Sequence, residues 1–242
     1  MRTNRFVEKT KEALECYDEK RIAPKGFSVG DDKAEDCVLI IGLNPAGDES
    51  DAMREQTDKT YLYFIDDTRL RSDRVYNGYF GAIYKLVTST VGQAKWSWCN
   101  KEWNILEEEF DNSDDLSNDD KKLIKAFYDI HKDDSCTIYI GDMFYYHQTS
   151  SNELPLKKNG YDLCDYCEKM LEMHIDELKQ SNKTIRYIYI NNAQVSRYMS
   201  KNETYKEING VKVFFGGMLS GMRAMDIFSR ERLASEIKEK TK

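Results

Sequence analysis

The sequence predicts an α/β fold in which one parallel β-sheet lies between two layers of helices. Four short runs rich in apolar and β-branched residues are separated along the chain by stretches with helical periodicity. The first run, residues 37–41, is apolar at every position, as expected for a strand that is covered on both faces. Strands joined through helices are connected by right-handed crossovers, so the sequence predicts a three-layer αβα sandwich with a four-stranded parallel sheet.

Length and composition limit the class of protein before any motif is considered. The 242 residues can bury one substantial core, so we expect a single domain over 1–242, with residues 1–35 as an N-terminal helix and loop extension. A charged fraction of 33%, no apolar run long enough to cross a bilayer and no secretory signal pattern predict a cytoplasmic protein without a membrane partner. The six cysteines are then expected as free thiols. The net charge of -7 argues against a protein that coats nucleic acid generally, although a local basic face is compatible with it.

The chain begins with a predicted helix at about residues 4–19, in which apolar residues recur at steps of three and four and Asn4 is the expected N-cap. A polar loop over residues 20–36 contains proline and two glycines and leads into the strand at 37–41.

A long irregular segment, residues 48–75, follows this strand. It carries an aromatic patch at 61–64 and a basic patch with Arg69, Arg71 and Arg74. Such a long connection in a compact domain is more often functional or mobile than idle, and rings with arginines are what a nucleic-acid surface needs. A solvated loop with its tyrosines against the core remains the alternative.

The middle of the chain is predicted to be mainly helical. Helices are expected at about 77–91 and 118–131, the second capped by Ser117. The acidic run 107–120 between them is expected to be solvated. Three tryptophans in this region are expected to pack under a surface lobe: Trp96, Trp98 and Trp103.

A second strand is expected at 137–141, and a helix at about 161–180 follows it. This helix places Cys164, Cys167 and His174 along one face, from which they could reach one metal ion. No fourth ligand is recognisably spaced, and cysteine or histidine on an apolar stripe is usually part of a core. We therefore expect no metal site here.

The last third of the chain repeats the alternation of strand and helix. Strands are expected at 185–190 and 211–215, and Asn191-Asn192 is expected to cap a short helix between them. A final helix is expected at about 222–239.

The loop after the strand at 37–41 carries the main candidate site. Gly42 and Gly47 allow a sharp turn or the close approach of a ligand, and Pro45 stiffens the backbone between them. Asn44 is thus an amide held on a rigid loop at the sheet edge where open α/β sheets bind ligands. A tight turn in which Asn44 supplies only turn chemistry explains the pattern equally well. Neither a phosphate loop nor a dinucleotide motif follows this strand.

Residues 42–47, GLNPAG, resemble the first motif of the uracil-DNA glycosylase superfamily, in particular its mismatch-specific branch. Residues 218–222, MLSGM, are similar to a degenerate form of the late motif of that branch. Asp142 stands where the superfamily usually keeps an asparagine, and Gln148-Thr149 resembles the residues that follow it. The resemblance covers about 36–240 in element order, and it implies a uracil-DNA glycosylase-like sheet with a cleft at the strand tips.

The resemblance also implies roles for individual residues. Asn44 would hold the water that attacks the sugar, and Asp142 would meet the edge of a flipped base. Ser220 would contact the flanking phosphate, and Met222 would take the place of the wedge that enters the base stack. Phe64 and Phe144 are the candidates for stacking on the base. The other implied substrate-binding residues are Gly42, Leu43, Pro45, Gly47, Gly221 and Arg223.

Two functions from different classes follow. The first is a DNA base glycosylase, a base-excision hydrolase that binds DNA with modest affinity and needs neither a metal nor another cofactor. The second is a catalytically inert α/β protein that binds a nucleotide, a base or another small ligand in the same cleft. Asn44 favours the first, whereas the net acidity and Met218, which replaces a polar residue of the late motif, favour the second. An ionised Asp142 only accepts hydrogen bonds and would select a base that presents N–H groups.

Overall fold

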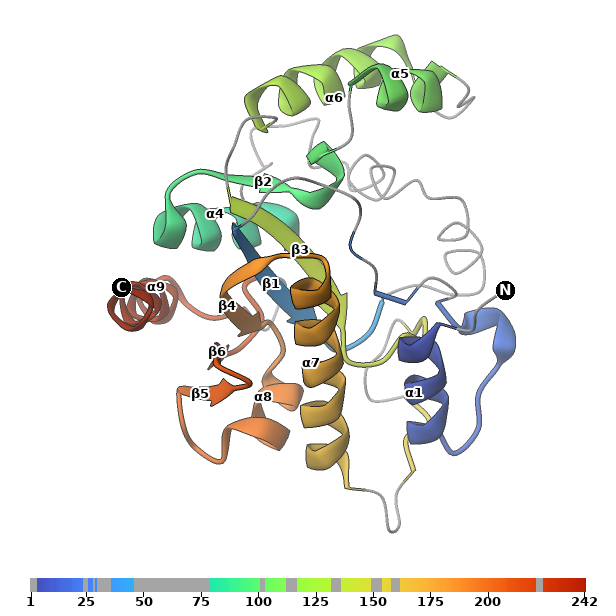
Figure 1. Ribbon diagram of the computed structural model, residues 1–242, viewed down its shortest axis with the longest axis vertical. Coiled ribbons are helices and arrows are strands. Elements are labelled where there is room, and N and C mark those ends of the chain that lie inside the picture. Colours follow the sequence, from blue (N-terminus) through green and yellow to red (C-terminus); the bar gives the residue numbers. More distant parts are fainter. Residues whose placement is uncertain are drawn as a thin grey trace.

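The computed structural model contains six β-strands in one sheet. They are β1 (Asp36–Gly42), β2 (Ala94–Trp96), β3 (Cys136–Asp142), β4 (Thr184–Ile190), β5 (Tyr205–Ile208) and β6 (Val211–Phe215). Their order across the sheet is β2-β3-β1-β4-β6-β5 (Figure 1). The structure describes residues 4–23, 26, 27, 29, 36–45, 79–100, 103–111, 117–131, 136–148, 154–157, 162–220 and 224–242.

The four expected strands are β3, β1, β4 and β6, which are neighbours and run parallel to one another. β1 lies inside the sheet, as its apolar sequence predicts. The expected number of four strands is wrong, because β2 adds a short parallel strand beside β3 and β5 adds an antiparallel strand beside β6. β5 and β6 are joined by Asn209-Gly210, both with positive φ, which is the sequence and geometry of a tight hairpin turn.

Helices cover both sides of the sheet (Figure 1). Leu39 and Ile41 of β1 join one apolar cluster with α1 (Arg5–Ala13), α7 (Leu163–Gln180) and α8 (Ala193–Ser200). Val38 and Ile40 join the opposite cluster with α4 (Tyr79–Val91) and α9 (Ile227–Thr241). The alternation follows from the two-residue period of a strand, so β1 is buried from both sides.

Two expected helices have different ends in the structure. α1 ends at Ala13 rather than at residue 19, because the next residues pair with another segment: the amide of Glu15 donates to the carbonyl of Pro155 at 2.7 Å. α9 begins at Ile227 rather than at residue 222, because Asp226 caps it and accepts a hydrogen bond from the amide of Ser229 at 2.9 Å.

The expected helices at 77–91, 118–131 and 161–180 correspond to α4, α6 (Asn118–His131) and α7. The acidic run 107–120 begins within a helix that was not expected, α5 (Trp103–Asp111), and Glu107, Glu108 and Asp119 are exposed, as a solvated run predicts. Leu106 on α5 is buried in the same cluster as Trp96 and Trp98, so this helix has an apolar side that a count of acidic residues conceals.

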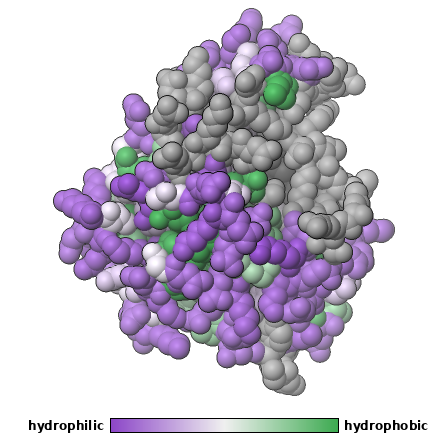
Figure 2. All heavy atoms as spheres, viewed as in Figure 1, coloured by the Kyte–Doolittle hydropathy of each residue, from purple (hydrophilic) through white to green (hydrophobic). Residues whose placement is uncertain are grey.

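The described residues on the face shown in Figure 2 are mostly hydrophilic, with apolar side chains in small patches among them. Within the described parts of the chain, no helix has the length and apolar character needed to cross a bilayer.

Candidate functional site

The carboxyl ends of the parallel strands bring together residues from four separate parts of the chain. Gly42 at the end of β1 lies opposite Asp142 at the end of β3. Asn191 directly follows β4, and its amide donates to the carbonyl of Ile41 at 2.8 Å. The side chain of Asn191 also holds the backbone of Leu219, beyond β6, at this edge. This is the edge at which open α/β sheets bind ligands.

Hydrogen bonds of its side-chain amide fix the orientation of Asn44. Its Nδ2 atom donates to the carbonyls of Pro45, Tyr146 and Gln148 at 2.9, 3.3 and 2.8 Å. Carbonyl oxygens only accept hydrogen bonds, so the nitrogen must be the atom that faces them, and the orientation of Oδ1 follows. The turn interpretation is therefore correct in part, since Asn44 links two loops, while its oxygen remains a directed acceptor.

The loops after β1 and β3 run side by side beyond the sheet. The amides of Met143, Phe144 and Gln148 donate to the carbonyls of Gly42, Leu43 and Pro45 at 3.2, 2.8 and 3.1 Å. These bonds continue the pairing of the two strands into the loops. As a result, hydrogen bonds from the loop after β3 hold the described part of the loop that carries Asn44.

Asp142 explains why residue 42 is a glycine. A β-carbon at position 42 would lie 2.5 Å from Oδ1 of Asp142, which is closer than real contacts allow. The hydroxyl of Tyr79, the first residue of α4, lies 3.7 Å from the same point. Burial, reinforced by the negative charge of Asp142, raises the pKa of Tyr79 well above its ordinary value. Tyr79 is therefore a neutral hydroxyl beside a carboxylate.

Asn191 is the residue that the sequence interpretation missed. It was expected to cap a helix together with Asn192, but only Asn192 does so, accepting from the amides of Gln194 and Val195. Asn191 is 3% exposed, and its Oδ1 accepts from the amide of Leu219 at 2.8 Å. Its Nδ2 faces the hydroxyl of Tyr79, and this contact lowers the pKa of Tyr79 against the larger effect of burial. Asn191 thus links α4 to the loop after β6 inside the strand tip.

The late motif reaches the same edge. Ser220 is half-buried and follows Leu219, which Asn191 holds in place. Met218 pairs with Ala224 in an isolated bridge, and its carbonyl accepts from the amide of Met225 at 2.8 Å. Four of the predicted site residues lie outside the described part of the chain: Gly47, Gly221, Met222 and Arg223.

Phe144 does not offer a surface to a base. It has no exposed area, and its ring stacks on Tyr166 with 4.8 Å between centroids and 12° between planes. Leu43 is also buried, at 4% exposure. These two side chains support the loop from inside the core. Phe64, the aromatic patch 61–64 and the three arginines of residues 69–74 lie outside the described residues.

Both ring nitrogens of His174 form hydrogen bonds within the protein. Its Nδ1 atom must donate to the carbonyl of Met170 at 2.7 Å, so its Nε2 atom accepts from the hydroxyl of Tyr145 at 2.8 Å. Burial lowers the pKa of His174 to about 3. Both ring nitrogens are engaged, and no three His, Cys, Asp or Glu side chains gather to hold a metal in the described part of the structure.

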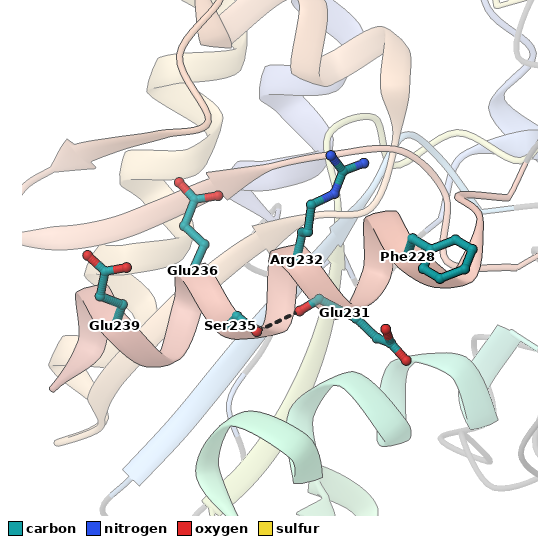
Figure 3. A pocket seen from close by; sticks show the side chains of 6 residues that line it. All are labelled: Phe228, Glu231, Arg232, Ser235, Glu236 and Glu239. Atoms are coloured by element: carbon teal, nitrogen blue, oxygen red, sulfur yellow. Dashed lines mark hydrogen bonds between the residues drawn. The ribbon is translucent and has the colours of Figure 1, made fainter.

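A shallow hollow lies along the exposed side of α9 (Figure 3). It contains none of the strand-tip residues. Its described lining is Phe228, Glu231, Arg232, Ser235, Glu236 and Glu239.

The chain matches no protein-family model and no curated protein.

Proposed function

We propose that the strand tips form the active site of a DNA base glycosylase, which hydrolyses the N-glycosidic bond of a damaged or mismatched base. The observation that carries this proposal is the fixation of Asn44. Three carbonyls hold its Nδ2 atom, so Oδ1 is a preoriented acceptor at the ligand-binding edge of the sheet. The similarity of residues 42–47 to the first glycosylase motif supports the same assignment.

In this mechanism Asn44 orients the attacking water through Oδ1. An amide is a poor base, but the water needs little activation if the base departs first and leaves a sugar with oxocarbenium character. Asn44 then contributes by positioning the water and by placing a partly negative oxygen near the positively charged sugar. It does not remove a proton from the water in advance.

Asp142 and Asn191 fit the recognition of a base edge. The carboxylate of Asp142 accepts an N–H group, whereas Nδ2 of Asn191 has a second N–H group, besides the one that faces Tyr79, to donate to a carbonyl. A base with an N–H beside a carbonyl, such as uracil, hypoxanthine or xanthine, offers both. The base must first leave the stack to reach these groups.

A small-ligand binding protein without catalysis is the second candidate. Phe144 is buried against Tyr166, so it provides no stacking surface for a flipped base. Met218 stands where the late motif of the glycosylases has a polar residue. Both observations favour a cleft that binds a base or nucleotide and releases it unchanged.

The first prediction separates these candidates with Asn44→Ala. We expect a loss of about 100-fold or more in single-turnover release of base, because a positioning group is removed. The assay uses duplexes that carry uracil, hypoxanthine, xanthine or a mismatched thymine. Stability should also fall by about 1 to 3 kcal/mol, because three carbonyls lose their donor.

Asn192→Ala is the matched control. It removes a helix cap and costs about 1 kcal/mol of stability, yet Asn192 belongs to α8 and makes none of the Asn44 contacts. Base release by this variant should stay near that of the parent. If the parent releases base from none of the duplexes, and Asn44→Ala behaves identically, the binding protein is the correct assignment.

A further inference from the structure

Two arginines at the strand tips have no carboxylate partner among the described residues: Arg21 and Arg230. Arg5 and Arg186, in contrast, each pair with a carboxylate, at 2.6 and 3.3 Å. The positive charges of Arg21 and Arg230 are therefore available to an anion.

Arg21 is tied directly to the loops around Asn44. Its Nη1 atom donates to Oε1 of Gln148 at 2.7 Å, and its carbonyl accepts from the amide of His147 at 2.7 Å. The carbonyl of Gln148 is one of the three that hold Asn44. The acidic neighbours of Arg21 are engaged elsewhere. Asp18 accepts from the amide of Lys20, and Glu19 pairs with the ammonium of Lys11 at 3.0 Å.

Arg230 occupies the corresponding place beyond β6. Its Nη1 atom donates to the carbonyl of Leu219 at 3.4 Å, immediately before Ser220. Its Nε atom is buried and has no partner among the described residues. Asp226, one turn earlier on α9, uses its carboxylate on the amide and hydroxyl of Ser229, at 2.9 and 2.6 Å. Because Nε is closed to solvent, an anion can approach this guanidinium only through its Nη atoms.

The two arginines lie on opposite sides of the candidate site. Arg21 contacts the loop after β3, and Arg230 contacts the loop after β6. β1 and β4 lie between these strands, so about 14 Å separates the two flanking strands at the usual spacing. Figure 1 likewise shows the N-terminal segment and α9 on opposite sides of the sheet.

We propose that Arg21 and Arg230 each bind a backbone phosphate of one nucleic-acid strand that crosses the strand tips. This inference rests on the proposed function and names its substrate as a polymer. A free base has no anionic group, and the single phosphate of a mononucleotide cannot reach both sides of the site. A strand with its target base over Asp142 and Asn191 carries phosphates in both directions. Guanidinium groups suit this role because they form forked hydrogen bonds with phosphate oxygens.

The test uses Arg21→Gln and Arg230→Gln, with Arg186→Gln as the control. Arg186 pairs with Asp36 where β4 and β1 begin, at the opposite edge of the sheet. Binding of a uracil-containing duplex, and of its single strand, is measured by fluorescence anisotropy over a range of salt concentrations. Each of the first two changes should weaken binding about 10-fold at low salt and reduce the salt slope by about 0.9. Arg186→Gln should alter neither quantity.

Lysine variants at the same positions distinguish charge from structure. Arg21→Lys and Arg230→Lys should keep the parental salt slope, because a contact through charge alone needs only the cation. Binding of free uracil should be unchanged in all variants. Parental salt slopes in both glutamine variants, equal losses for free uracil, or no oligonucleotide binding by the parent at low salt would each overturn the proposal.

The same measurements separate this inference from the glycosylase proposal. Binding that depends on both arginines without any base release by the parent would leave the inference standing and remove the glycosylase assignment. Base release by the parent, combined with unchanged salt slopes in the glutamine variants, would give the opposite result.

Discussion

Single residues at the strand tips are constrained by one another rather than by the sheet. Gly42 is needed because Asp142 occupies the space of its missing β-carbon, at 2.5 Å. Asn44 is needed because three carbonyls converge on its amide. Residues that hold polar side chains in this way are typical of sites that are built for a ligand, since packing alone does not require them.

The second prediction is a double-mutant cycle on Gly42 and Asp142. Gly42→Ala alone should destabilise the fold by about 1 to 3 kcal/mol, because the new methyl group collides with Oδ1 of Asp142. In the background of Asp142→Ala the same change should cost about 1 kcal/mol less, because the colliding carboxylate is gone. Urea unfolding of the four proteins measures the difference. Equal costs in both backgrounds would show that Asp142 does not limit position 42.

At the scale of elements, the sequence predicts the strands that are covered on both faces. β1, β3, β4 and β6 were predictable because strands covered on both faces require continuous apolar runs. β2 was missed because it has only three residues, and β5 because only its Asn209-Gly210 turn marks it. In the candidate site, the positions of Asn44 and Asp142 at strand ends, and of Ser220 in the loop after β6, were predictable. The buried amide of Asn191 was not, since its position depends on a contact with Leu219, which is distant in sequence.

The third prediction concerns α7 and its contact with the loop after β3. His174 has a folded-state pKa of about 3, against an ordinary value of 6.5. Between these values the unfolded chain binds a proton that the folded protein does not. Folding stability should therefore fall as the pH drops below about 6.5, by at most about 1.4 kcal/mol per pH unit from this group.

Urea unfolding between about pH 7 and pH 5 measures this dependence, above the range where most carboxylates titrate. His174→Gln should be less stable at pH 7, because it loses the contacts with Tyr145 and Met170, but its stability should depend less on pH. The same pH slope in parent and variant would exclude His174 as the source.

At the scale of the whole molecule, the N-terminal segment packs into the core on one face of the sheet. Ala23 and Arg21 form backbone hydrogen bonds with Tyr145 and His147, at 3.0 and 2.7 Å. Phe6 is 1% exposed and lies beside His174, with 4.7 Å between ring centroids. This segment therefore supports the loop that carries Tyr146 and Gln148, whose carbonyls fix Asn44. The N-terminal segment and the candidate site therefore form one structural unit, joined through the loop after β3.

The last prediction tests this unit with Phe6→Ala. Removing a fully buried ring should cost about 3 to 5 kcal/mol, and unfolding should remain one cooperative transition because α1 shares its core with α7. Tyr17→Ala is the control. Tyr17 is 40% exposed, with its ring near the ammonium of Lys11, so its loss should cost less than about 1 kcal/mol. Unfolding is followed by circular dichroism and by tryptophan fluorescence. Two separate transitions in Phe6→Ala, the first confined to the N-terminal segment, would show that this segment folds independently of the sheet.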